Sequence, residues 1–159
     1  MSFPSIASWD AVSAIATSVA ALGVLLAFWQ VWLSRSIAQL QFEDALAREY
    51  RELCTTIPAQ VFLRRDLSDE DYQRTFDEFY RYIDLSNEQA SLRQRGRISK
   101  AVWESWCEGI KHNLSLPPFA RAWGEVKEAA NGSFQELRAL EAAGFKGDPK
   151  RWPKRHSEA

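Results

Sequence analysis

The chain has no Lys or Arg before residue 35, although it carries 20 of these residues in total. A secretory signal peptide begins with a basic region, so the start of this chain does not fit one. The two cysteines are too few and too far apart to indicate a zinc or redox motif. A glycine-rich phosphate loop and a nucleophile elbow are also missing. We therefore expect no cofactor, no metal and no catalytic residue.

Charge is absent from Ala11–Leu33, which lies between Asp10 and Arg35. A helix needs about 20 apolar residues to cross a hydrocarbon core about 30 Å thick. A buried helix of a soluble domain would show a more polar face, and aromatic residues such as Trp9 and Trp32 mark the two ends of the run, as at membrane interfaces. The sequence predicts a single transmembrane helix over residues 11–33.

The distribution of basic residues predicts the orientation of this helix. Arg35, Arg48 and Arg51 follow the apolar run closely, and the stub before it has no basic residue. Because cytoplasmic flanks carry the excess of Lys and Arg, we expect the N-terminus outside and the C-terminal region in the cytoplasm. Cys54 and Cys107 would then be free thiols in a reducing compartment.

Strand signals are scarce, and helical periodicity dominates the chain after residue 34. Apolar residues at helical spacing continue the membrane helix to about Thr56, before the breaker Pro58. Further helices are expected after Ser68 and Ser99, which are N-cap residues, and after Ser133, which forms a capping box with Glu136. The predicted fold class is all-α. The predicted segments are a stub (1–10), a transmembrane helix (11–33), a membrane-proximal helix (34–57), a cytosolic helical bundle (58–145) and a basic flexible tail (146–159).

Large aromatic residues supply the predicted core of the bundle. The apolar faces of its helices must cover one another, because no helix can bury its own face. The residues that we assign to this core are Trp103, Trp106, Phe119 and Trp123.

Small residues recur on one face of the predicted membrane helix, at Ala16, Ala20, Gly23 and Ala27. Small residues at steps of three and four let two helix backbones approach closely in a membrane, so this face is a candidate association surface. The alternative is that they simply face lipid. A neighbouring, mildly polar ridge contains Ser13 and Thr17, and it would line a pore in a multimer or bond to its own helix.

A polar cluster is predicted on the second long helix at Asp84, Asn87 and Glu88, either as a site or as a structural network tied to nearby arginines. Glu104, Glu108 and His112 share one face of the next helix. That spacing suits a divalent metal, although we favour a solvated face because further ligands are missing.

The predicted tail is basic around one aromatic residue. Its candidate contacts with lipid headgroups or phosphate are Lys150, Arg151, Trp152, Lys154 and Arg155, and the alternative is a solubilising terminus. Arg151 and His156 also match the Arg-x4-His spacing of the HEPN ribonucleases, a helical family, but Pro153 interrupts the motif.

Longer motifs carry a second resemblance. The chain has Asn87-Glu88, then Trp103-x-x-Trp106-x-x-Gly109-Ile110, then Pro118-Phe119. Over roughly residues 10–125 this pattern resembles an uncharacterised family of small bacterial inner-membrane proteins. The resemblance implies one N-terminal membrane helix and a cytosolic helical domain at the inner membrane, and it implies no activity.

The sequence therefore favours a non-enzymatic, single-pass membrane-anchored interaction module that self-associates or binds another membrane protein. The expected partners are the lipid bilayer and a homo-oligomer or membrane protein, and nucleic acid is not expected. The alternative is an oligomeric membrane pore or effector, for example in a defence system, because the architecture loosely resembles the small membrane accessory proteins of RNA-targeting defence systems. A third hypothesis is an RNA-processing enzyme that uses Arg151 and His156.

Overall fold

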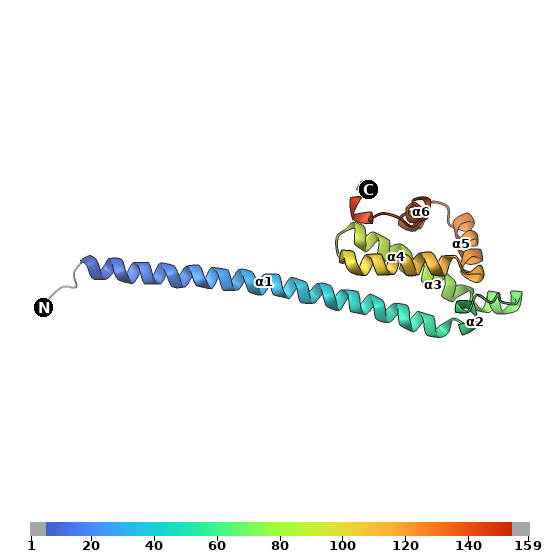
Figure 1. Ribbon diagram of the computed structural model, residues 1–159, viewed down its shortest axis with the longest axis horizontal. Coiled ribbons are helices and arrows are strands. Elements are labelled where there is room, and N and C mark those ends of the chain that lie inside the picture. The colour runs from blue at the N-terminus through green and yellow to red at the C-terminus, as the bar shows by residue number, and fades with distance from the viewer. Residues whose placement is uncertain (1–5, 154–159) are drawn as a thin grey trace. The chain divides into compact units, whose positions relative to one another are not determined.

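The computed structural model describes residues 6–153, apart from the side chains of residues 6–13, 15 and 16. The described chain contains only helices and the turns between them, which confirms the all-α prediction (Figure 1). It divides into two units, Met1–Phe42 and Glu43–Ala159. The elements are α1 (Ile6–Thr56), α2 (Ala59–Phe62), α3 (Asp69–Gln94), α4 (Lys100–Leu114), α5 (Pro117–Ala129), α6 (Gln135–Ala142) and the 3₁₀ helix η1 (Pro149–Arg151).

The last part of α1 belongs to the second unit and presents one buried stripe. Glu43, Leu46 and Leu53 are buried at intervals of three and seven residues, and Ile57 continues the stripe just beyond the helix. This is the spacing at which one face of a helix meets a neighbour. α1 ends at Thr56, where Pro58 disfavours helical geometry in the residue before it.

The core of the second unit is built around α3, which packs against α5, α6 and η1. The Phe119 ring of α5 lies edge-on to both Phe79 and Tyr82 of α3, with centroids 4.8 Å apart in each case. Tyr72, two turns earlier on α3, stacks on Phe79. Such pairs add about 0.5–1.5 kcal/mol each beyond the area they bury.

The predicted aromatic core is confirmed for Trp103, Phe119 and Trp123, which are all buried. Trp106 differs, because its side chain is only half-buried. It occupies the edge of the apolar face of α4, where helical spacing alone does not distinguish a core position from a groove wall.

The first turns of the helices are capped in two ways. Ser68 and Ser99 cap α3 and α4 as predicted, and their hydroxyls accept hydrogen bonds from the N–H groups of Asp71 and Val102. In α4 the third helical residue is Val102, which cannot reach back to the cap residue as a glutamate would. Glu43 of α1 takes this role, because its carboxylate accepts a hydrogen bond from the Ser99 N–H.

The predicted capping box at Ser133 and Glu136 is wrong. The N-cap residue of α6 is Phe134, which has a left-handed backbone (φ 57°) and gives no side-chain cap. The Phe134 side chain is instead buried in the aromatic core, with its ring edge-on to Trp123. Burial of this ring shifts the helix start by one residue.

Residues 146–153 differ from the irregular tail that the sequence predicts. η1 lies in this segment, Pro149 is buried, and η1 packs on α3. Asp148 caps η1 and forms a two-pronged ion pair with Arg93 of α3, whose side chain is 6% exposed. The same guanidinium donates a hydrogen bond to the Ile98 carbonyl at 2.7 Å, so Arg93 joins the α3–α4 turn to η1.

Candidate functional sites

The apolar part of α1 is exposed wherever its side chains are described. Val24, Leu25 and Phe28 are 68%, 65% and 76% exposed, and nothing within the described residues covers them. α1 is long and apolar enough to cross a membrane, by length and composition. A contiguous apolar surface of this kind on one helix marks a site of contact with lipid or another protein.

Three residues of the small-residue stripe, Ala20, Gly23 and Ala27, are exposed on this segment, and the Ala16 side chain lies outside the described set. A methyl group added at Gly23 would meet no atom within 4 Å, so nothing in the unit fills the space beside the stripe. On the opposite face of the helix, the Ser18 hydroxyl donates to the Ala14 carbonyl at 2.9 Å, which satisfies it within its own helix.

The three residues of the predicted polar cluster on α3 have different surroundings. Asn87 accepts a hydrogen bond from the Leu137 N–H at 3.1 Å, so it caps the first turn of α6 from another helix. Asp84 and Glu88 are exposed. Asn87 therefore has a structural role, which was the alternative to a functional site. Its partner, however, is a backbone N–H rather than one of the arginines.

The face with Glu104, Glu108 and His112 is exposed to solvent. Glu104 pairs with Lys100 at 3.4 Å on the surface of α4. Within residues 6–153, no group of three or more His, Cys, Asp and Glu side chains is placed to hold a metal ion.

The basic residues at the end of the chain are only partly described. Lys150 and Arg151 are exposed, whereas Trp152 is half-buried and lines a small groove with Gln135 and Ala139 of α6. Trp152 therefore contacts the protein itself. Lys154, Arg155 and His156 lie outside the described residues, so the pairing of Arg151 with His156 is not described.

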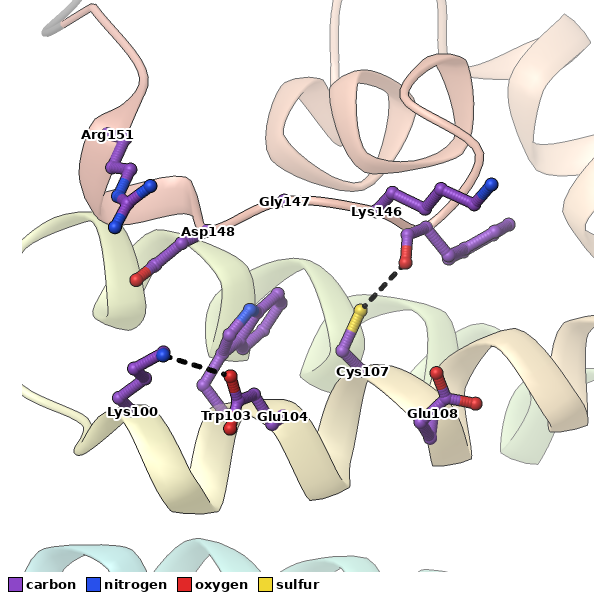
Figure 2. Close-up of a pocket in the computed structure, with 10 residues that line it drawn as sticks. Lys100, Trp103, Glu104, Cys107, Glu108, Lys146, Gly147, Asp148 and Arg151 are labelled. Atoms are coloured by element: carbon purple, nitrogen blue, oxygen red, sulfur yellow. Dashed lines mark hydrogen bonds and ion pairs between the residues drawn. The ribbon is translucent and has the colours of Figure 1, made fainter.

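A groove of about 420 Å³ lies between α4 and residues 145–151 (Figure 2). Its charged lining residues are of both signs, and Lys100 and Glu104 pair with each other. Cys107 lies in its wall and donates to the Phe145 carbonyl, with sulfur and oxygen 3.5 Å apart. Burial, and secondarily the Glu108 carboxylate, raise the pKa of the Cys107 thiol above its ordinary value. Because the thiolate is the nucleophilic form, this thiol is poorly reactive at neutral pH.

A second groove, of about 380 Å³, is formed by the end of α1, α3 and α4, and we name it the Gln89 groove. Beneath it, the Asn113 amide donates to the hydroxyls of Tyr50 and Tyr82 at 3.3 and 3.0 Å. This network fixes the positions of α1, α3 and α4 within the second unit. The groove is lined by Ala47, Tyr50, Arg51, Tyr82, Gln89, Ser105, Trp106, Gly109 and Ile110.

Sequence reasoning missed the Gln89 groove. The one local signal is Gly109, since glycine within a helix costs about 1 kcal/mol relative to alanine and calls for a reason. In the structure Gly109 lines the groove, and a methyl group there would meet no atom within 4 Å.

In comparisons with known proteins, no family model, no curated protein and no solved structure matches the chain.

Proposed function

We propose that this protein is a single-pass membrane-anchored module whose helical domain mediates contacts at the cytoplasmic face of a bacterial inner membrane. The observation that carries the proposal is the exposed apolar surface of α1, where Val24 and Phe28 are about two-thirds or more exposed. At about 25 cal/mol per Å² of apolar surface removed from water, such a segment strongly favours lipid.

The orientation in this proposal follows from charge. Arg35 is the first basic residue of the chain, and Arg48 and Arg51 follow it on α1. The positive-inside rule places that end of the helix in the cytoplasm. The second unit, Glu43–Ala159, would then be cytoplasmic.

The proposed mode of action is contact rather than catalysis. The poorly reactive thiol of Cys107 and the solvated carboxylates of Glu104 and Glu108 support this, because none of them is poised as a nucleophile or an acid–base pair. The exposed face at Ala20, Gly23 and Ala27 supports self-association through close backbone packing.

Fractionation of cells that express the full chain tests the anchor. We expect the wild-type protein in the membrane pellet after alkaline carbonate extraction. The double variant Val24→Asp, Phe28→Asp should move to the supernatant, since an aspartate costs about 3 kcal/mol of insertion at the centre of a membrane helix and less towards its end. Leu63→Asp is the matched control, because Leu63 is equally exposed but lies outside the apolar run. Wild-type protein that is extracted by carbonate would refute the anchor.

Cross-linking in native membranes tests self-association separately. We expect Gly23→Ile to reduce the dimer fraction, because the branched side chain fills the space beside the stripe. Ala21→Ile introduces the same side chain on a different face and should have no effect. Equal dimer fractions in the two variants would refute the stripe as the contact surface.

A further inference from the structure

The Gln89 groove combines an apolar wall with a polar group that has no partner among the described residues. Gln89 is only 5% exposed, and its side-chain amide makes no hydrogen bond within residues 6–153. Neither polar atom of its side chain is fully enclosed, and the residue lines the groove, so the amide faces it. A ligand that fills the groove removes this amide from water, so the ligand must supply both a donor and an acceptor to avoid the cost of an unpaired buried amide.

The surrounding side chains restrict the chemistry of such a ligand. Trp106 of α4 is half-buried and offers an aromatic surface to the groove. Arg51 of α1 is exposed at the groove and has no ion pair among the described residues. The volume of about 380 Å³ falls at the lower end of the usual range for small-molecule sites.

We propose that the Gln89 groove binds a small planar heteroaromatic anion. The ring stacks on Trp106, its hydrogen-bonding edge pairs with the Gln89 amide, and its anionic group lies at Arg51. A glutamine amide presents a donor and an acceptor side by side, which matches the edge of a nucleobase. Stacking on an aromatic side chain and a single cation complete the recognition of a mononucleotide-sized molecule. This proposal does not depend on the membrane anchor.

Gly109 leaves space for the proposed ligand in the Gln89 groove. It stands in the groove wall, and a methyl group there meets no atom within 4 Å. Any side chain at this position would occupy the space that the ligand needs. The absence of a side chain keeps the groove open at the cost in helix propensity noted above.

Calorimetric titration of the full chain in nanodiscs of neutral lipid tests the proposal. The probes are the nucleoside monophosphates AMP, GMP, CMP and UMP, with adenosine and ribose 5-phosphate as probes that lack the anion or the ring. We expect saturable binding of at least one monophosphate, and weaker binding of both partial probes.

Matched variants localise the binding. Gly109→Leu should abolish it, whereas Gly124→Leu should not, because Gly124 is a helical glycine with equally open surroundings outside the groove. Gln89→Met should weaken binding about tenfold and Arg51→Gln about fivefold, with Arg48→Gln as the control. Both leucine variants replace a helical glycine, so both should fold.

Three results would overturn the proposal. The first is that none of the monophosphates binds. The second is that Gly109→Leu binds as tightly as Gly124→Leu. The third is that Gly109→Leu changes the oligomeric state of the protein, which would mean that a second copy of the chain covers the groove.

Discussion

Removal of the charge on Asp148 should destabilise the helical unit by about 2–3 kcal/mol. The Arg93 side chain is 6% exposed and the Asp148 side chain 17%, so the pair is largely shielded from water. Breaking a buried pair by losing one partner costs about 3–5 kcal/mol. In Asp148→Asn the cost is lower, because the amide oxygen remains an acceptor and Arg93 keeps its bond to the Ile98 carbonyl. For a unit of this size the loss corresponds to a fall in Tm of roughly 10 °C.

The difference in unfolding free energy between wild type and Asp148→Asn should also depend on pH. Hydrogen bonds from Arg93 hold the pKa of Asp148 below its ordinary value. A carboxyl whose pKa is lowered by folding adds stability above its ordinary pKa, and this stability is lost as the pH falls through the lowered folded value. The difference between wild type and Asp148→Asn should therefore be complete at neutral pH and should shrink below about pH 4.

Urea unfolding of the full chain in mild detergent measures the difference, with near-ultraviolet circular dichroism reporting on the buried aromatic rings. Glu104→Gln is the matched control, since its pair with Lys100 is more than 60% exposed on both sides and should contribute at most about 0.5 kcal/mol. Equal unfolding midpoints for the two variants at neutral pH would refute the reasoning. A difference that stays constant into acid would also refute the assignment to the ionised carboxylate.

The remaining predictions concern the caps, the core and the thiol. Asn87→Ala should cost about 1 kcal/mol in the same unfolding assay and should speed amide hydrogen exchange at Leu137, because it removes the cap of α6. Glu43→Ala should likewise speed exchange at Ser99, and unchanged exchange there would contradict the inter-helix cap. Phe119→Ala should cost about 3–5 kcal/mol, measured by the urea midpoint, because it removes a fully buried ring. Cys107 should react slowly with iodoacetamide at pH 7 and faster only at alkaline pH, followed by mass spectrometry, since burial raises its pKa.

Local sequence patterns are sufficient for the helices and for some, but not all, of their ends. The all-α fold and the caps at Ser68 and Ser99 follow from periodicity and from polar residues before an apolar run. The start of α6 does not follow, because its cap comes from Asn87, 50 residues earlier in the chain. Phe134 is held in a left-handed conformation by the burial of its ring, and no local sequence pattern predicts this conformation.

The Gln89 groove could not be predicted from the sequence, because it also depends on how distant helices pack. Trp103 and Trp106 are three residues apart on α4, and both lie on its apolar face. One is fully buried and the other borders the groove, and the difference arises only when α1 and α3 are in place. Gln89 reads as an ordinary polar residue until its burial is known.

The long-range polar interactions of the helical unit also have to form in a fixed order during synthesis. In each of three such interactions, the side chain of an earlier helix bonds to a partner that lies 50 to 56 residues later in the sequence. The pairs are Glu43 with Ser99, Asn87 with Leu137 and Arg93 with Asp148. At about 5–20 residues per second, the ribosome delivers that partner roughly 3–10 s after the waiting side chain. Each interaction forms only after its later partner has been synthesised, so the interactions of the nascent protein form in order from its first helix towards its last.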